Sequence, residues 1–174
     1  MELRDVLQTR RSVRAYRPEP VPADVLERVL QAARVAPSAN NLQPWKFIVV
    51  RDERLRRHLV ALCCDQAFVG EAPLVIAACG LPTRGGIGGY ASSMPVDVAI
   101  ALDHLTLAAR EEGLGTCWIG AFDHDGVRDL LGIPASVHVV AITPLGYPKR
   151  PDAFRPSGNR KPLDEIVCWD RYQA

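Results

Sequence analysis

Apolar residues recur along the chain at helical spacing in some stretches and form short continuous runs in others. A short helix is predicted over residues 2–8, and a longer one begins at Pro22 and ends before Pro37. Proline in the first turn and Asp24 at the positive end favour this longer helix. Three prolines between these two helices predict an extended linker over residues 13–22.

Further along, strands are predicted over residues 46–51, 74–78, 116–119 and 137–143, with helices over residues 54–62 and 123–131. The longest helix, residues 94–112, is apolar nearly all round. A helix with so narrow a polar face needs burial on most sides, so it is either central or packed against a second subunit. Alternating helices and strands without internal repeats favour an α/β or α+β fold in one domain, residues 1–174.

Two segments stand outside this alternation. Residues 80–93 hold five glycines and predict a mobile loop or a lid. The tail from Pro148 is polar first and apolar last, and its final apolar side chains are Leu163, Ile166, Val167, Trp169 and Tyr172. We expect this tail to wrap over a partner chain, because such residues are not left in water.

Composition narrows the class of protein. The chain is 48% hydrophobic and 24% charged with a net charge of +1, which disfavours a nucleic acid or an anionic membrane as partner. It shows no signal-peptide pattern and no apolar run near 20 residues, so no membrane association is expected. Five cysteines without C-x-x-C spacing fit reduced thiols and a cytoplasmic location.

Two polar clusters carry the candidate chemistry. The first, here called the arginine cluster, is Arg10, Arg11, Ser12 and Arg14 at the end of a predicted helix, where guanidinium groups suit a phosphate. The second, the Ser–Asn loop, is residues 37–43, which place a hydroxyl and several amides just before an apolar strand. Surface arginines and a plain turn are the alternatives. Together the clusters suggest a ligand with a phosphate at one end and heteroatoms at the other.

The sequence Asp123-His124-Asp125 looks at first like a metal cluster. The alternative that we favour is an aspartate capping the next helix, with His124 facing solvent. The other histidines are dispersed without ligand spacing, so no metal site is expected.

Four elements in order resemble the nitroreductase family of FMN-dependent flavoproteins: residues 10–14, residues 33–45, residues 113–120, and residues 145–148 with Arg160-Lys161-Pro162-Leu163. The resemblance covers nearly the whole chain and implies an α+β fold with a central mixed β-sheet flanked by helices. It also implies a homodimer with FMN at each subunit interface and the tail, residues 148–174, exchanged onto the partner. Stability would then depend on dimerisation.

The resemblance also implies roles for individual residues. Arg10, Arg11 and Ser12 would hold the FMN phosphate together with Arg160 and Lys161 from the tail. Arg14 would act catalytically, as a positive charge beside N1 and the C2 carbonyl of the reduced flavin. The partner subunit would contribute Pro37, Ser38, Ala39, Asn40, Asn41 and Gln43.

Trp118, Ile119 and Gly120 would follow the ring edge, with the N–H groups of Ile119 and Gly120 near N5 and O4; this gives Gly120 a catalytic part. Cys117 is expected to be a packed residue and not a nucleophile. The glycine-rich stretch Gly85–Gly89 is expected to shape the acceptor pocket with Tyr90.

The implied activity is transfer of hydride from NAD(P)H through flavin N5 to a small organic acceptor, by a ping-pong mechanism. Nitroaromatics, quinones and enones are the candidate acceptors. A flavin-binding or storage module with little turnover, a specialised enzyme of the family such as a reductive dehalogenase, and a flavin-free scaffold that binds another anion are the alternatives.

Overall fold

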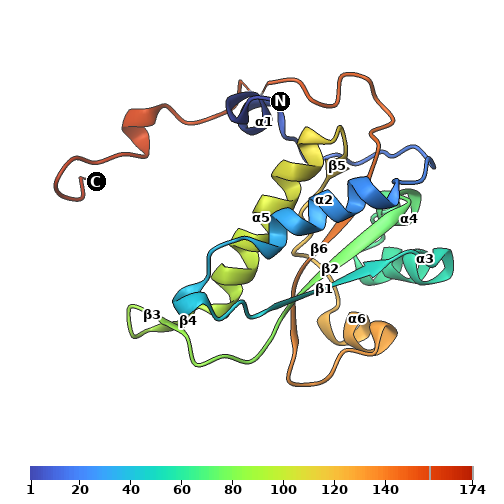
Figure 1. The fold of residues 1–174 in the computed structure, drawn as a ribbon, viewed down its shortest axis with the longest axis horizontal. Helices are drawn as coiled ribbons and strands as arrows, with labels where there is room; N and C mark the ends of the chain where they lie inside the picture. The colour runs from blue at the N-terminus through green and yellow to red at the C-terminus, as the bar shows by residue number, and fades with distance from the viewer. Residues whose placement is uncertain (157, 174) are drawn as a thin grey trace.

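The fold is built around a central antiparallel sheet, and helices cover both faces of this sheet (Figure 1). The computed structural model describes residues 1–156 and 158–173. The helices are α1 (Leu3–Thr9), α2 (Ala23–Arg34), η1 (Ala39–Asn41), α3 (Glu53–Leu62), α4 (Phe68–Glu71), α5 (Met94–Glu111), α6 (His124–Leu131) and η2 (Leu163–Glu165). The strands are β1 (Trp45–Val50), β2 (Leu74–Gly80), β3 (Gly86–Ile87), β4 (Ala91–Ser92), β5 (Gly115–Thr116) and β6 (His138–Gly146).

The sheet has the order β1-β2-β6-β5, and each of these neighbouring strands pairs antiparallel. A single bridge between Ser12 and Thr116 adds a parallel contact beyond β5. The small pair β3–β4 forms a separate antiparallel hairpin. The predicted α+β fold with a central sheet flanked by helices is therefore confirmed. The paired strands of this sheet are all antiparallel, so the expectation of a mixed sheet is wrong, and the isolated bridge at Ser12 is parallel.

Strand β2 shows why the sheet is covered on both sides. Its residues Leu74, Ile76 and Ala78 belong to the core under α2 and α5. The alternate residues Val75, Ala77 and Cys79 belong to the opposite core, under α3, α4 and α6. A continuous apolar run suits such a strand, because both of its faces are buried.

Helix α5 lies across one face of the sheet beside α2 (Figure 1). Its residues Val98, Leu102, Leu105 and Ala109 are fully buried against the sheet. On its other side, Val96 is 47% exposed, and Pro95, Val96, Ala99 and Ile100 line a shallow apolar hollow. The apolar pattern all round the helix thus corresponds to one face in the core and one face that the described residues leave uncovered.

Most helix ends lie within a residue or two of the positions predicted from capping residues and apolar periodicity. Asp52 and Asp123 cap α3 and α6, since their carboxylates accept the N–H groups of Leu55 and Gly126 at 3.0 and 3.1 Å. Gly132 closes α6 at φ +65°. The four-residue helix α4 was not predicted, and β2 and β6 run longer than expected. Among the described residues, no helix has the length and apolar character needed to cross a membrane.

The tail leaves the body near α1 and extends away from it (Figure 1). Its large apolar side chains Leu163, Ile166, Trp169 and Tyr172 are all at least 63% exposed. Exposed apolar side chains of this size are a feature of surfaces that another chain covers. Their exposure fits the predicted wrapping of the tail over a partner, which stays a prediction.

Candidate functional site

The segment that carries the arginine cluster is pinned on both sides by backbone hydrogen bonds. The Val13 N–H donates to the Thr116 carbonyl at 2.8 Å, and the Arg17 N–H donates to the Tyr147 carbonyl at 2.9 Å. The Lys149 N–H donates in turn to the Ala15 carbonyl at 3.0 Å. The prolines predicted an extended conformation correctly, but this part of the chain is an edge of the sheet and not a free linker.

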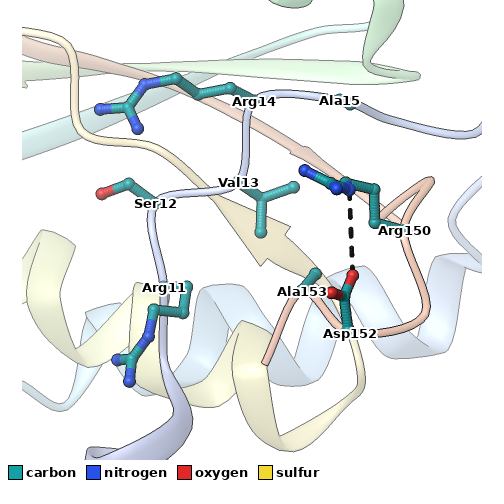
Figure 2. A pocket seen from close by; sticks show the side chains of 8 residues that line it. All are labelled: Arg11, Ser12, Val13, Arg14, Ala15, Arg150, Asp152 and Ala153. Carbon is teal, nitrogen blue, oxygen red and sulfur yellow. Dashed lines mark ion pairs between the residues drawn. The ribbon is translucent and has the colours of Figure 1, made fainter. Parts of the chain in front are cut away.

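Burial along this segment separates core side chains from candidate ligand contacts. Val13 and Tyr16 are buried, whereas Ser12 and Arg14 are exposed and point away from Val13 (Figure 2). A Cβ on Gly115 would lie 2.6 Å from a Val13 methyl, so only glycine lets the chain pack this closely. The Tyr16 hydroxyl donates to the Val13 carbonyl at 2.7 Å, and burial raises the pKa of Tyr16 far above its ordinary range.

Basic side chains surround two adjoining hollows at this end of the molecule. Arg11, Ser12 and Arg14 line the first together with Arg150 and Asp152, in a volume of about 370 Å³ (Figure 2). Arg11 and Arg160 line the second, of about 430 Å³, with Leu7, Gln8 and Pro156. Arg160 therefore lies near Arg11 of the arginine cluster, although the tail contributes it from far along the chain. Its role beside this cluster stays a prediction.

Arg11 differs from its neighbours because its guanidinium already caps α1. It donates to the Arg10 carbonyl at 2.6 Å and to the Gln8 carbonyl at 3.2 Å. Such bonds satisfy carbonyls that a helix end leaves without partners. Part of the donor capacity of Arg11 is therefore used within the chain, although its side chain lines both hollows.

The segment from Cys117 to Gly120 runs beside the arginine cluster and is fastened to β6. The Cys117 N–H donates to the Thr143 hydroxyl at 3.2 Å, and Ile119 exchanges both backbone hydrogen bonds with Ile142, at 2.8 and 3.1 Å. The Ile119 N–H is therefore engaged within the sheet, and the expectation that it faces a flavin atom is wrong. Trp118 is 44% exposed, and Gly120 is exposed with room for a Cβ, which would make an ordinary contact with Trp118 Nε1 at 3.8 Å.

Cys117 lies under this segment as a packed residue, as predicted. It is 2% exposed, and burial raises the pKa of its thiol although nearby Arg14 opposes the shift. A thiol held in its neutral form by burial is a poor nucleophile. Its contribution is to packing beneath Ser12 and Arg14.

The Ser–Asn loop is a tight turn in which several residues adopt left-handed backbone angles. Asn40, Asn41 and Gln43 have φ values of 51°, 55° and 49°. The Ser38 hydroxyl accepts the Gln43 N–H at 2.9 Å, and the Gln43 side-chain amide donates to the Asn41 carbonyl at 2.9 Å. Asparagine tolerates this conformation better than most residues. Asn40, Asn41 and Gln43 are exposed, with Pro37 beside them, so the turn presents its amides outward.

The two polar clusters lie at opposite ends of α5. Ala39 contacts Asp97 in the first turn of this helix, whereas Thr9, next to the arginine cluster, contacts Arg110 in the last turn. At about 1.5 Å per residue, these two anchors are separated by about 20 Å. The structure thus places residues 117–120 beside the arginine cluster and Arg160 beside Arg11, and it leaves the Ser–Asn loop apart from them.

Asp123-His124-Asp125 is a helix start, as expected, but His124 does not simply face solvent. It is half-buried, its Nε2 accepts the Val139 N–H at 3.3 Å, and its ring lies 5.8 Å from that of His138. Within the described residues, no group of three or more His, Cys, Asp or Glu side chains is placed to hold a metal ion.

Sequence reasoning missed two side chains that shape the site. Thr143 holds the Cys117 N–H, and Asp97 holds the Ala39 N–H at 2.9 Å. Each is a polar residue on a buried element of otherwise apolar character, with Thr143 fully buried and Asp97 4% exposed. An acid on the buried face of an apolar helix was the available signal for Asp97.

Known proteins are similar to this chain in sequence and in architecture. The family model "Nitroreductase family" matches residues 7–147. An NADH dehydrogenase from Thermus thermophilus is 35% identical over 191 residues, covering 92% of each chain, and an FMN reductase (NAD(P)H) from Bacillus subtilis is 30% identical over 95% of this chain and 72% of its own. The crystal structure of a nitroreductase family protein from Clostridium novyi NT superposes with a TM-score of 0.82 at 34% identity over 86% of both chains. This chain therefore belongs to the nitroreductase family.

Proposed function

We propose that this protein is an FMN-dependent oxidoreductase that passes hydride from NAD(P)H to a small organic acceptor such as a nitroaromatic, a quinone or an enone. The observation that carries the proposal is the bridge between Ser12 and Thr116. It sets the basic side chains of the arginine cluster directly beside residues 117–120, so an anionic group and a flat ring can be held by adjacent segments. The names of the Thermus and Bacillus relatives support this class of reaction.

The residues present fit FMN on their chemistry. Arg10, Ser12 and Arg160 offer two guanidinium groups and a hydroxyl for a phosphate, and charge-assisted hydrogen bonds of this kind contribute about 1.5–3 kcal/mol each. Lys161 follows Arg160 in the exposed tail and adds a second positive charge there. Gly120 is exposed, and the atom nearest to a Cβ placed there would be Trp118 Nε1.

When bound, FMN supplies hydride transfer at its N5 atom, a reaction that no side chain performs. Arg14 contributes a fixed positive charge where the reduced ring system becomes negative, which favours reduction. Trp118 and Gly120 would border the ring edge, and the N–H of Gly120 would donate on the N5–O4 side.

We further propose a homodimer in which the Ser–Asn loop serves the flavin of the partner. The separation of about 20 Å between the anchors of the two clusters supports this division. The apolar hollow on α5 and the exposed side chains of the tail are surfaces that a second copy would cover. Each flavin would then contact the arginine cluster of one subunit and the amides of Asn40 and Asn41 from the other.

The test is purification, identification of bound flavin after release by heat, and steady-state assays with NADH and NADPH against menadione and nitrofurazone. We expect a yellow protein that holds FMN and oxidises a nicotinamide only when an acceptor is present. A yellow protein without turnover would support a flavin-storage module instead. A protein that stays colourless after incubation with FMN would refute the proposal.

A further inference from the structure

Asp97 is a buried carboxylate in a helix whose other buried side chains are apolar except for Thr106. It is 4% exposed, between the buried residues Met94 and Val98. Its Oδ1 accepts the Ala39 N–H at 2.9 Å, whereas its Oδ2 is buried without a hydrogen-bond partner in the described structure. Burial of an incompletely bonded carboxylate costs stability, so packing of α5 alone does not account for this residue.

The turn that Asp97 holds is one that the chain adopts at a cost. Three non-glycine residues, Asn40, Asn41 and Gln43, have positive φ, and such residues persist where the surroundings fix them. Local bonds shape the turn, since the Asn41 N–H donates to the Ser38 carbonyl and the Leu42 N–H to the Ala39 carbonyl, both at 3.0 Å. These bonds stay within the loop. The bond from Ala39 to Asp97 crosses 58 residues of sequence and fixes the loop relative to α5.

We infer that Asp97 is a positioning residue for the flavin site: by holding the Ala39 N–H, it aims the outward amides of Asn40 and Asn41 at the flavin of the partner subunit. Asp97 does not touch the ligand. The inference rests on the proposed function for its ligand, but the anchoring of the loop is a property of the chain alone.

The variants Asp97→Ala and Asp97→Asn separate anchoring from packing. Alanine removes the acceptor, whereas asparagine keeps a side-chain oxygen that can accept the Ala39 N–H. Asp129→Asn is the matched control, because Asp129 is an exposed acid on α6, away from both clusters. Circular dichroism and thermal melting check that each variant is folded.

The first measurement is hydrogen–deuterium exchange of the peptide spanning residues 37–45 in flavin-free protein. Loss of one hydrogen bond to a charged group should speed exchange of the Ala39 amide about tenfold or more in Asp97→Ala. Asp97→Asn and Asp129→Asn should resemble the unsubstituted protein. Unchanged exchange in Asp97→Ala would overturn the anchoring, whether or not the protein binds a flavin.

The second measurement is the Kd for FMN and for riboflavin, from quenching of flavin fluorescence. Asp97→Ala should weaken both ligands about tenfold while leaving their affinity ratio unchanged, since the phosphate contacts are elsewhere. Asparagine should restore binding. If Asp97→Ala binds FMN as tightly as the unsubstituted protein, or if asparagine is as damaging as alanine, the positioning role is wrong. If the unsubstituted protein takes up no FMN, the proposed function fails, and exchange alone decides whether Asp97 anchors the loop.

Discussion

The two ends of α5 hold their polar clusters in different ways. Near its C-terminal end, the arginine cluster sits on an extended segment that is hydrogen-bonded to Thr116, Tyr147 and Lys149, so it is an extension of the sheet. Near its N-terminal end, the Ser–Asn loop is a strained turn bonded mainly to itself and tied to the helix through Asp97. A cation that meets a phosphate acts through charge, which tolerates some displacement. Amides that bind a flat ring do so through hydrogen bonds, whose strength depends on their angle, and these amides therefore need a fixed backbone.

The largest effect is expected from complementation between subunits. It tests whether the arginine cluster and the Ser–Asn loop of one chain serve flavins in different sites of the dimer. One copy carries Arg10→Ala with Arg14→Ala, and a differently tagged copy carries Asn40→Gly with Asn41→Gly, because glycine keeps the left-handed backbone while removing the amides. Each variant alone is expected to bind FMN poorly at both sites of its dimer. The mixed dimer should regain about one FMN per dimer, since one of its sites combines an intact cluster with an intact loop.

The control for complementation is a mixed dimer of two copies that both carry the arginine substitutions under different tags. It should bind no better than its parents. The measurement is the flavin-to-protein ratio after tandem affinity purification. If the complementing mixture also stays at the parental level, the two clusters serve the same subunit's ligand and the division between subunits is wrong.

The next effect in size concerns the phosphate. Arg10→Ala should raise the Kd for FMN about 10- to 100-fold, because one charge-assisted hydrogen bond is lost, and should leave riboflavin binding nearly unchanged. Arg11→Ala should have a smaller effect, since its guanidinium is already bonded to the carbonyls of Gln8 and Arg10. Flavin fluorescence titration gives both constants. Equal losses for FMN and riboflavin would show that Arg10 does not recognise the phosphate.

The role of Arg14 is tested through the redox potential of the bound flavin. Arg14→Ala should lower the two-electron midpoint potential of bound flavin by about 30 mV, which corresponds to about 1.4 kcal/mol of lost stabilisation of the reduced state. Arg14→Lys keeps the charge and should retain most of the potential. Spectroscopic titration against a reference dye measures both variants. An unchanged potential in Arg14→Ala would remove its assigned role.

The smallest expected effect is on stability, and it concerns the ion pairs of Arg28 that join α2 to the C-terminal end of α5. Arg28 donates to Glu112 at 2.7 and 3.0 Å and to Asp24 at 3.0 Å, and these bonds hold the pKa values of both carboxyls below their ordinary range. A carboxyl with a lowered folded pKa stabilises the fold above its unfolded pKa and loses that contribution as the pH falls. Arg28→Ala should therefore melt slightly below the unsubstituted protein at pH 7.

Melting curves recorded from pH 7 to pH 3 test this tie. The difference between Arg28→Ala and the unsubstituted protein should shrink below about pH 4.5, where both carboxyls begin to take up protons. Arg57→Ala on α3, which removes an ion pair with Glu53 far from α5, is the comparison variant. A difference that grows toward low pH would contradict the assignment.

Elements with strong local signals were predictable from the sequence. The apolar stripe of α2, the caps at Asp52 and Asp123, and the doubly buried run of β2 each depend on neighbours along the chain. Helix α4 was missed because four residues that include a glycine carry little periodicity. Strand β2 extends to Gly80 because Gly80 pairs with Trp45, and no local feature of residues 79–80 indicates that partner.

The site was predicted where its residues follow one another and missed where distant segments meet. The arginine cluster and the Ser–Asn loop are contiguous motifs and were found as such. The contacts from Thr143 to Cys117 and from Asp97 to Ala39 join residues 26 and 58 positions apart. The Ile119 N–H was misassigned for the same reason, because its partner Ile142 is supplied by the fold.

The rigid length of α5 has a consequence for how this chain can diverge. An inserted or deleted residue in the middle of the helix would turn everything beyond it by about 100° and displace it by 1.5 Å. The buried row of Val98, Leu102 and Leu105 would lose its alignment, and Ala39 and Thr9 could no longer both meet their partners on the helix. The β3–β4 hairpin carries no such restriction. Changes of length are expected to accumulate there, while α5 keeps a constant number of turns.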